Sequence, residues 1–404
     1  MVKFLRLFLS QLLIVAIICF SVSAATVSSE CDISDVDTPL ETAVNNAAIG
    51  QKLDIKAKSV VLMEPHTGTV LYESNCDEKL APASITKVMA LLLVMEALDR
   101  GDITLETVVT ASEHACSMGG SQIWLEPNET MTVHELLKAT VIASANDACV
   151  ALGELISGSE EGFVALMNSR AKELGCNNTN FVNCTGLDAD GHLTSAYDVA
   201  VMSSELIKHP LIKDYSTVWM DSLRNGESEL VNTNKLVRFY EGATGLKTGT
   251  TSTAGYCLSA TAERNGMELV AVVMAGDTSS DRFNGAKKLL DYGFANYSFI
   301  EIEADLTENG EVKVKKGVKK TVKVKAKEKL KLLLPKSEAG NINQIITFKK
   351  DINAPVNKGE LLGRVEIFVG DKSVGSVDII ANDKVSRLNL WILFKQIAKG
   401  MLVL

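Results

Sequence analysis

A serine and a lysine three residues apart begin a strongly apolar stretch, APASITKVMALLLVMEAL at residues 81–98. On a helix, positions i and i+3 share a face, so the ammonium of Lys87 can approach the hydroxyl of Ser84. A serine hydroxyl becomes an effective nucleophile when a neighbouring base removes its proton. Lysine can be that base only if its pKa is lowered, which burial in a helix that is apolar on all sides would achieve. The alternative is that Ser84 is an ordinary helix N-cap.

Two further short motifs follow in the chain. IASANDACV contains Ser144 and Asn146 in the pattern S-x-N, and GLKTGTTSTAGY contains the tripeptide that begins at Lys247, K-T-G. The order S-x-x-K, S-x-N, K-T-G is the signature of penicillin-binding proteins and serine β-lactamases. The middle position of the second motif is Ala145 where that signature has aspartate, and this position varies across the wider group.

The chain resembles one family within this group, the D-alanyl-D-alanine carboxypeptidases, which are penicillin-binding proteins of low molecular mass. Within the family it is similar to the type found in spore-forming Gram-positive bacteria. The resemblance extends over nearly the whole mature chain. It rests on these stretches: PASITKVM, NDACVALGE, NFVNCTGLDADGHLTSAYDVAVMSSELIKHP, GLKTGTTSTAGYCL and RFNGAKKLLDYGF.

The resemblance implies that the protein removes the terminal D-alanine from peptidoglycan stem pentapeptides and binds penicillin covalently. Ser84 corresponds to the acylated nucleophile and Lys87 to its general base. Ser144 corresponds to a proton relay to the leaving amine. Asn146 corresponds to a partner of both the substrate amide and Lys87.

The third motif corresponds to a strand that borders the substrate cleft. There the charge of Lys247 would help to lower the pKa of Lys87 and would attract a carboxylate. Thr248 and Gly249 belong to the same substrate-binding strand, and Thr248 would assist in holding the carboxylate.

The resemblance also supplies an oxyanion hole and a second cation. The backbone N–H groups of Ser84 and Thr250 would form the oxyanion hole. The family often has histidine at the position of Thr250, but threonine leaves the backbone donor intact. Arg282 corresponds to an arginine that steadies the terminal carboxylate of the substrate.

Three other functions remain open from the sequence. A serine β-lactamase usually carries, in a recognisable loop after S-x-N, a glutamate that deacylates the enzyme quickly. None of the candidate glutamates here lies in the pattern of that loop. Endopeptidase action on cross-links uses the same chemistry. A penicillin-binding scaffold without activity would not need the intact motifs. The glutamates considered are Glu154, Glu160, Glu161, Glu173 and Glu205.

Composition and charge argue against metals, cofactors and nucleic acid as partners. The five histidines show no metal-ligand spacing, so we expect no metal and no cofactor. Residues 25–297 carry 19 Lys and Arg against 37 Asp and Glu, whereas residues 298–404 carry 20 against 13. The acidic N-terminal part and the basic C-terminal part argue against nucleic acid as a partner. They indicate that the C-terminal part faces anionic lipid or wall polymer.

The N-terminus reads as a secretory signal over residues 1–24, with Lys3 and Arg6 before an apolar stretch and small residues at the cleavage site. An uncleaved anchor helix is the alternative. The protein is therefore expected outside the cytoplasmic membrane, on its outer face or in the cell wall. Seven cysteines remain after the signal and show no regular spacing. Buried free thiols are the preferred interpretation, although Cys176 and Cys184 could pair.

The elements around these motifs predict an α/β (α+β) catalytic domain of β-lactamase/transpeptidase-like fold over residues 45–297. Strands are expected at 59–65 and 68–74, and a mostly helical region runs from Ser84 to about Lys208. In that region Thr132 and Glu135 form a capping-box signature ahead of a stretch with helical periodicity over 132–155. The segment 254–276 predicts a hairpin around ERNG, and 281–297 predicts a helix.

The remaining chain predicts two further parts. Residues 299–386 alternate Val or Leu with Lys, which indicates a small all-β domain, a β-sandwich, with a solvated outer face. Residues 387–404 predict an amphipathic helix that lies in a membrane interface, with Lys395, Gln396 and Lys399 on one side. The alternative is a helix docked on the β domain.

Overall fold

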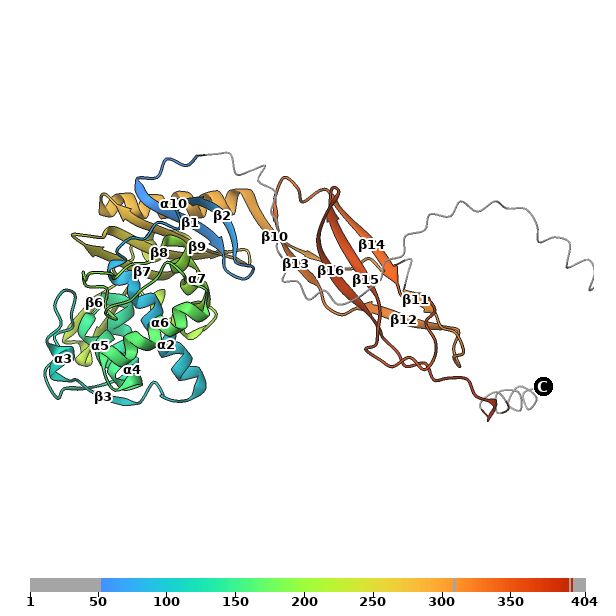
Figure 1. Cartoon of the computed structure of the whole chain (residues 1–404), viewed down its shortest axis with the longest axis horizontal. Coiled ribbons are helices and arrows are strands. Elements are labelled where there is room, and N and C mark those ends of the chain that lie inside the picture. The colour runs from blue at the N-terminus through green and yellow to red at the C-terminus, as the bar shows by residue number, and fades with distance from the viewer. Residues whose placement is uncertain (1–51, 308–309, 392–393, 395–404) are drawn as a thin grey trace, which may run out of the picture. The chain divides into compact units, whose positions relative to one another are not determined.

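The computed structural model describes residues 52–307, 310–391 and 394 of the 404-residue chain (Figure 1). The expected signal segment 1–24, residues 45–51 of the expected catalytic domain and most of the tail lie outside the described residues. The catalytic and C-terminal domains are described separately below.

The catalytic domain is built around a five-stranded sheet in which every neighbouring pair of strands is antiparallel. The strand order β2-β1-β9-β8-β7 makes β7 an edge strand. The predicted hairpin around ERNG is confirmed, because β8 pairs with β9 across a short turn, and the two strands predicted at 59–65 and 68–74 pair as β1 and β2. The strands are β1 (Ala57–Glu64), β2 (Thr69–Ser74), β7 (Ala243–Thr251), β8 (Gly255–Arg264) and β9 (Met267–Gly276).

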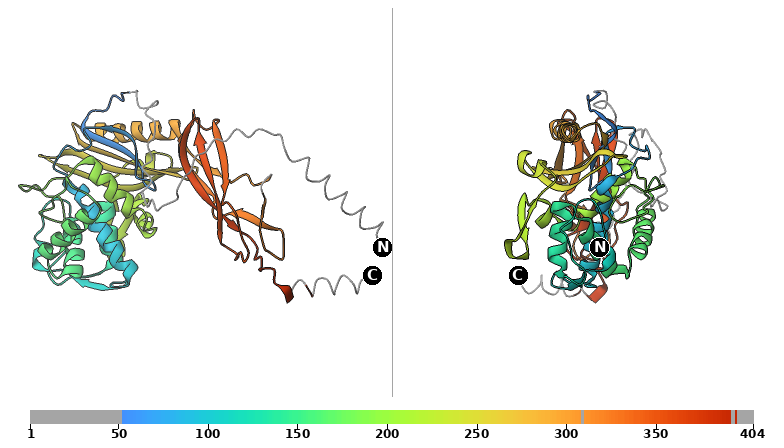
Figure 2. Two further views of the ribbon diagram at one scale, coloured as in Figure 1. Left: turned by 45° about the vertical axis from the view of Figure 1, so that its right-hand side comes forward. Right: turned by 90° about the vertical axis from the view of Figure 1, so that its left-hand side faces the viewer.

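Helices cover both faces of this sheet, as the views in Figures 1 and 2 show. Side chains alternate between the faces of a strand, and β1 follows this rule: Val61 and Met63 join the core beneath the helical region, whereas Val60 and Leu62 join the core beneath α10. Both faces are therefore buried. The long helices are α2 (Lys87–Arg100), α5 (Asn146–Ser157), α6 (Glu160–Glu173), α7 (Ala196–Leu206) and α10 (Ser279–Asn296).

Shorter elements connect the long ones. The short helices are η2 (Ala83–Thr86), α3 (Glu113–Cys116), α4 (Val133–Lys138), η3 (Ala139–Ala143), α8 (Leu211–Ser216), η4 (Arg224–Gly226) and α9 (Leu236–Phe239). The short strands are β3 (Val108–Thr110) paired with β4 (Thr130–Thr132), and β5 (Met220–Leu223) paired with β6 (Ser228–Val231).

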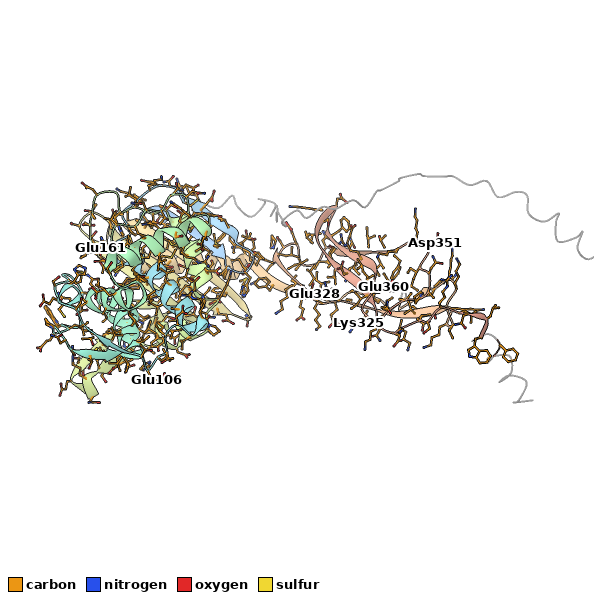
Figure 3. All side chains as sticks on the ribbon, turned by 60° about the horizontal axis from the view of Figure 1, so that its bottom comes forward. Glu106, Glu161, Lys325, Glu328, Asp351 and Glu360 are labelled. Atoms are coloured by element: carbon orange, nitrogen blue, oxygen red, sulfur yellow. The ribbon has the colours of Figure 1, made fainter. Side chains whose placement is uncertain are left out.

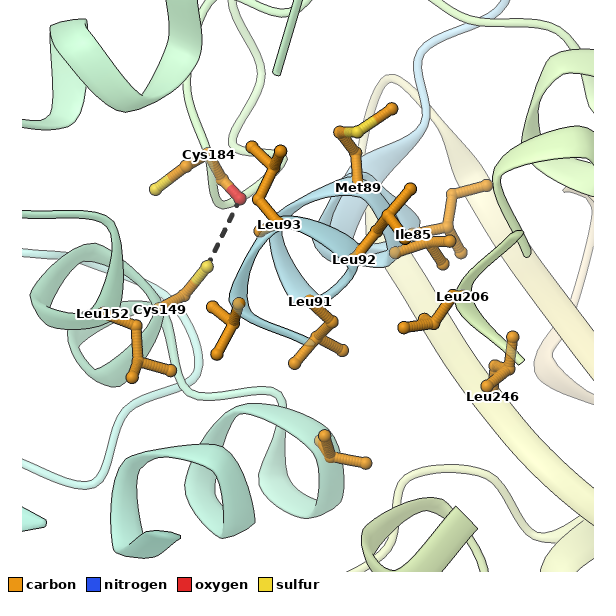
Figure 4. Close-up of a cluster of buried hydrophobic side chains, with 14 of the residues drawn as sticks. Ile85, Met89, Leu91, Leu92, Leu93, Cys149, Leu152, Cys184, Leu206 and Leu246 are labelled. Atoms are coloured by element: carbon orange, nitrogen blue, oxygen red, sulfur yellow. Dashed lines mark hydrogen bonds between the residues drawn. The ribbon is translucent and has the colours of Figure 1, made fainter. Parts of the chain in front are cut away.

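Helix α2 is buried on every side, as the sequence predicted. All residues from Lys87 to Met95 are buried. Figure 4 shows Leu91 and Leu93 pointing to different sides of the helix, and it shows side chains of α5, α7 and β7 around the helix. The helix ends at Gly101, whose φ of 75° gives the left-handed C-cap that glycine adopts without strain.

The predicted periodic helix over 132–155 is confirmed at its start and wrong in its middle. Thr132 and Glu135 form the expected capping box at the start of α4. The chain then forms a π-helical turn, η3, and Ser144 takes a left-handed conformation with φ 62° before α5 begins at Asn146. The apolar pattern continues through this break because both helices bury their faces in the same core.

The C-terminal domain is all β, as predicted. Its core is shared by a five-stranded sheet of order β11-β12-β16-β15-β14 and a separate β10-β13 pair. Val322 and Val324 are buried, whereas Lys323 and Lys325 between and after them are exposed. Figure 3 shows Lys325 and other labelled charged side chains at the surface. The strands are β10 (Tyr297–Ile302), β11 (Glu311–Lys313), β12 (Thr321–Ala326), β13 (Leu330–Pro335), β14 (Ile342–Phe348), β15 (Leu361–Val369) and β16 (Lys372–Ala381).

The cysteines of the described residues are free thiols, and five of the six are buried. Cys176 and Cys184 do not pair, so the preferred interpretation of small buried hydrophobes holds for them. Their pKa values are raised, chiefly by burial for Cys176 and by a hydrogen bond to Cys149 for Cys184.

Candidate active site

Ser84 lies in the short 3-10 turn η2, one turn ahead of α2. No side chain caps either helix, because neither Pro82 nor Thr86 at the cap positions makes a capping hydrogen bond. The alternative reading of Ser84 as an N-cap is therefore wrong. Its side chain is half-buried, so the hydroxyl remains open to a ligand on one side.

Lys87 is fully buried, and its Nζ atom has three neighbours. It lies 3.1 Å from Ser84 Oγ, 2.6 Å from Asn146 Oδ1 and 2.7 Å from the carbonyl oxygen of Thr185. A neutral amine has two N–H bonds and one lone pair. If the N–H bonds go to the two carbonyl oxygens, which can only accept, the lone pair faces the Ser84 hydroxyl.

Burial also lowers the pKa of Lys87 from its ordinary value of 10.5. The Cys149 and Cys184 thiols and the Asp147 carboxylate act in the opposite direction, but burial prevails. A lysine that is neutral within reach of a serine hydroxyl is a general base.

Ser144 and Asn146 are placed by the π-helical turn and by the start of α5. Ser144 is buried at the end of η3, in a conformation that costs about 1–3 kcal/mol outside glycine and that concentrates at functional sites. The Asn146 side chain is fixed in orientation: its oxygen faces Lys87, and its Nδ2 donates to the carbonyl of Gly119 at 2.6 Å. The backbone N–H of Asn146 donates to the carbonyl of Ser121 at 2.7 Å.

The K-T-G motif lies on the edge strand β7, directly against η2. Lys247 is buried, and its pKa is lowered well below 10.5, first by burial and then by repulsion from Lys87 and Arg282. Thr248 Oγ1 donates to Thr233 Oγ1 at 2.7 Å. A Cβ on Gly249 would lie 2.8 Å from the backbone nitrogen of Ser84, so only glycine allows this approach.

Arg282 is buried beneath the end of the motif rather than exposed at the start of α10. Its Nη1 donates to the carbonyl of Gly249 at 2.9 Å and to Thr250 Oγ1 at 2.8 Å. The guanidinium lies 5.4 Å from the ring centroid of Tyr256 and 4.9 Å from that of Phe283. Its Nε is buried and has no hydrogen-bond partner among the described residues. Thr250 itself is exposed.

The structure therefore brings most of the residues that the sequence assigned to the site into contact with one another. Ser84, Lys87 and Asn146 are linked by hydrogen bonds, and Ser144 lies two residues before Asn146. Gly249 lies against the turn that carries Ser84, and Arg282 donates to Gly249 and Thr250. Several residues that position these groups were not predicted from the sequence.

Two missed residues act through the backbone. The carbonyl of Thr185 accepts from Lys87, and Gly186 packs so closely that a Cβ there would lie 1.9 Å from the carbonyl oxygen of Ala83. Gly186 also has a φ of 89°. Both residues lie in NFVNCTGLDADGHLT, a stretch that carries the family resemblance, but a backbone carbonyl gives no residue-type signal.

Two further missed residues act through buried side chains. His192 Nε2 lies 2.8 Å from Thr86 Oγ1, and its Nδ1 accepts from the N–H of Val182. The carboxylate of Asp147 accepts from the N–H groups of Ile123 and Leu125. Both side chains fasten loops to the elements that carry the site.

The other histidines contact neighbours elsewhere. Within the part of the chain that the structure describes, no group of three His, Cys, Asp or Glu side chains is placed to hold a metal ion. The remaining pairs are His66–Glu64, His114–Glu160, His134–Tyr215 and His209–Asp99.

An antiparallel sheet between helical layers, with a buried lysine hydrogen-bonded to a serine beside the edge strand, is the arrangement of the transpeptidase-like class of serine enzymes. Comparison with known proteins narrows the class. The sequence pattern of the D-alanyl-D-alanine carboxypeptidase family matches residues 45–278, and that of the penicillin-binding protein 5 C-terminal domain matches residues 302–387. The chain belongs to the D-alanyl-D-alanine carboxypeptidase family and is a serine-type D-Ala-D-Ala carboxypeptidase.

Individual relatives agree with this assignment. The chain is 48% identical over 312 residues to D-alanyl-D-alanine carboxypeptidase DacF of Bacillus subtilis, covering 76% of this chain and 80% of the relative. It is 34% identical to DacC of Escherichia coli, covering 82% and 84%. The crystal structure of penicillin-binding protein 5 from Haemophilus influenzae matches 83% of this chain and 99% of its own, with a TM-score of 0.70 and 32% identity.

A further solved structure is of a ligand-bound relative. Penicillin-binding protein D2 from Listeria monocytogenes, in an ampicillin-bound form, matches 60% of this chain and all of its own with a TM-score of 0.55 and 32% identity. The family comprises exported cell-wall enzymes that act on a peptide substrate and bind β-lactams.

Proposed function

We propose that the carboxypeptidase reaction proceeds through an acyl-enzyme on Ser84, with Lys87 as the general base. The observation that carries this proposal is the placement of Lys87 Nζ, 3.1 Å from Ser84 Oγ and held by two carbonyl oxygens. Lys87 takes the hydroxyl proton while Ser84 Oγ attacks the carbonyl carbon of the penultimate D-alanine. The backbone N–H groups of Ser84 and Thr250 donate hydrogen bonds to the negatively charged carbonyl oxygen.

Collapse of the tetrahedral intermediate breaks the peptide bond and releases D-alanine. The leaving nitrogen receives the proton held by Lys87, relayed through the hydroxyl of Ser144. Water then attacks the ester carbonyl while Lys87 takes one of the water protons. The bond between Ser84 Oγ and the acyl carbon breaks, and Lys87 returns the proton to Ser84 Oγ. The stem peptide leaves one residue shorter.

Residues 247–250 and Arg282 suit a substrate that ends in a carboxylate. Lys247, Thr250 and Arg282 supply an amine, a hydroxyl and a guanidinium close together. A carboxylate there would favour the charged form of Lys247, because it offsets the repulsion from Lys87. The free edge of β7 offers backbone groups to an extended peptide. We infer that the substrate is a peptidoglycan stem pentapeptide.

The same geometry accommodates penicillin. Attack of Ser84 Oγ on the β-lactam carbonyl opens the ring and leaves an ester on the enzyme, with a carboxylate at the end where Lys247 lies. The ampicillin-bound relative from Listeria supports this inference. β-Lactams are therefore proposed as covalent inhibitors.

The β-lactamase alternative finds little support in the glutamates. Glu154 accepts from Ser112, and Glu160 accepts from the N–H of Cys184. Glu161 is exposed. The last two glutamates, Glu173 and Glu205, pair with Arg170. The D,D-endopeptidase alternative needs the same acyl-enzyme and differs only in the leaving amine.

We also propose that the mature protein is held on the outer face of the cytoplasmic membrane by the tail 387–404. The few described residues of this tail support the proposal, because Leu390, Trp391 and Phe394 are 85%, 64% and 63% exposed and the two rings stack. No helix among the described residues is long and apolar enough to cross a membrane. We expect no nucleic-acid partner.

Ser84→Ala is the test of the mechanism. The variant should lose D-alanine release by a factor on the order of 10⁴ or more, because the covalent route is removed. It should also form no adduct with penicillin by mass spectrometry, while circular dichroism stays that of the wild type. Normal D-alanine release by the Ser84→Ala variant would overturn the proposal. A wild-type protein that hydrolyses penicillin rapidly and keeps no adduct would favour the β-lactamase.

A further inference from the structure

A tryptophan in the loop that contacts Asn146 is exposed although its backbone is tightly held. Trp124 lies in the loop between α3 and β4, and its side chain is 74% exposed. Its φ of 59° is unusual for a bulky residue and costs free energy. Ile123 and Leu125 on either side are buried. The loop therefore presents a large apolar ring to solvent in a strained conformation.

Two charged side chains hold this conformation from opposite sides. The buried Asp147 carboxylate accepts from the N–H groups of Ile123 and Leu125. Arg224 Nη1 donates to the carbonyl of Ile123 at 3.0 Å, and its Nη2 lies 3.4 Å from the carbonyl oxygen of Trp124. Both backbone neighbours of the tryptophan are thus fixed by charge-assisted hydrogen bonds.

The clamp is itself well anchored. Arg224 forms a two-bond pair with Glu129, at 2.8 Å and 3.1 Å, and this contact lowers the pKa of the Glu129 carboxyl. Asp147 follows Asn146 directly in α5 and also accepts from the N–H of Ala148. The conformation of Trp124 is consequently coupled to the helix start that carries Asn146.

The same loop contacts Asn146 of the candidate site. The carbonyls of Gly119 and Ser121 accept from Asn146, and a Cβ on Gly120 would lie 3.6 Å from Leu187. Trp124 is three residues beyond Ser121, within about 10 Å of chain. The carboxylate end of the cleft lies instead at Lys247 and Arg282. Asn146, which the resemblance assigns to the substrate amide, is therefore the point at which this loop approaches a bound peptide.

We propose that Trp124 is a specificity-determining residue that contacts the part of the stem peptide N-terminal to the cleaved bond. This inference rests on the proposed function. The indole face offers apolar contact area to aliphatic side chains of the peptide. Asp147, Arg224 and Glu129 are positioning residues that hold the indole in place before substrate binds, which reduces the entropy that binding must overcome.

Substrate length gives the decisive test. We compare D-alanine release from a pentapeptide that ends in D-Ala-D-Ala with release from an N-acylated D-Ala-D-Ala dipeptide, which is too short to reach Trp124. Trp124→Ala should lower the ratio of the two kcat/KM values by about tenfold, the effect expected from one lost apolar contact. The loss should appear in KM for the pentapeptide, and Trp124→Phe should recover most of it.

Two variants control the experiment. Phe239→Ala removes a different exposed aromatic side chain, 64% exposed on α9, and should keep the wild-type ratio. Arg224→Ala keeps Trp124 in the chain but removes the side chain that holds its backbone. The ratio of the two kcat/KM values should therefore fall, as it should for Trp124→Ala. An unchanged ratio in Trp124→Ala, with wild-type turnover of both substrates, would overturn this inference alone. A wild type that releases D-alanine from neither substrate would instead overturn the proposed function.

Fluorescence supplies a readout that does not depend on turnover. The sequence has three tryptophans, so Trp219→Phe with Trp391→Phe leaves Trp124 as the indole reporter. In a variant that combines these two substitutions with Ser84→Ala, binding of the pentapeptide should shift the emission of Trp124 to shorter wavelength. Binding of the dipeptide should not. An emission spectrum that stays unchanged at saturating pentapeptide would contradict a contact between Trp124 and the peptide.

Discussion

The Nε2 atom of His192 lies 2.8 Å from the hydroxyl of Thr86, two residues after the nucleophile. Burial lowers the pKa of this histidine to about 4, so the ring is neutral at neutral pH. Because Nδ1 accepts from the N–H of Val182, Nε2 carries the proton and donates to Thr86. A neutral histidine therefore joins the loop around residues 182–192 to the turn that carries Ser84.

This histidine should make the fold sensitive to mild acid. In the unfolded chain its pKa is about 6.5, so below that pH the unfolded state binds a proton that the folded state does not. The free energy of unfolding should fall as the pH falls from about 6.5 to about 4. Urea unfolding at pH 7 and pH 4.5 should show a difference roughly 2 kcal/mol larger for the wild type than for His192→Gln. Equal differences would show that His192 is protonated in the fold.

Lys87 should tolerate no other basic residue. Arginine keeps the charge but cannot release its proton at working pH, so Lys87→Arg should lose nearly as much activity as Lys87→Ala, about 10²–10⁴-fold or more. In the wild type, penicillin acylation should rise with pH through a pKa below 10.5, because only the neutral amine accepts the serine proton. Stopped-flow acylation from pH 5 to 10 measures both. Substantial activity of Lys87→Arg would mean that Lys87 acts through its charge alone.

Two glycines of one loop form a matched pair. Gly186 and Gly191 both have positive φ, 89° and 78°, but only Gly186 packs against the backbone of Ala83. Gly191→Ala should cost only the conformational penalty, about 1–2 kcal/mol of stability, and retain activity. Gly186→Ala should displace the Ser84 turn and lower kcat by at least about 100-fold, since small shifts of a catalytic group have effects of that size. Parallel loss of activity in both variants would point to loop stability rather than to this contact.

The tail should control localisation without affecting chemistry. Burial of several apolar side chains at about 1.5–3 kcal/mol each favours binding to a membrane interface, and the lysines add attraction to anionic lipid that salt weakens. Deletion of residues 387–404 should therefore release the mature protein from anionic liposomes in a flotation assay. Turnover of a small peptide should stay that of the full chain. If neither form of the protein floats with the liposomes, the tail is not an anchor.

Side-chain chemistry in short local patterns was predictable from the sequence. The three motifs identified the site, the apolar run predicted the burial of Lys87, and Thr132 with Glu135 predicted the capping box. The alternation of Val and Lys predicted the solvated face of the C-terminal sheet. Each of these signals lies within a few residues of the feature that it predicts.

Features that depend on distant backbone atoms were not predictable. The carbonyl of Thr185 and the close approach of Gly186 depend on a loop about 100 residues beyond Lys87. The clamp of Asp147 on Ile123 needs the tertiary structure, because an aspartate early in a helix reads as a favourable charge at the helix dipole. The π-helical turn was hidden because the apolar pattern continues through it.

Because of that turn, the orientation of the S-x-N motif depends on the number of residues in the turn as well as on their types. In residues 139–143 the helix is wound wider than an α-helix, and the N–H of Ala145 donates to the carbonyl of Ala139. An α-helix advances about 100° per residue, so deletion of one residue here would turn Ser144 and Asn146 by about that angle relative to α4. Deletion of a single codon in this apolar segment would therefore inactivate the enzyme, although the gene would still encode every motif residue.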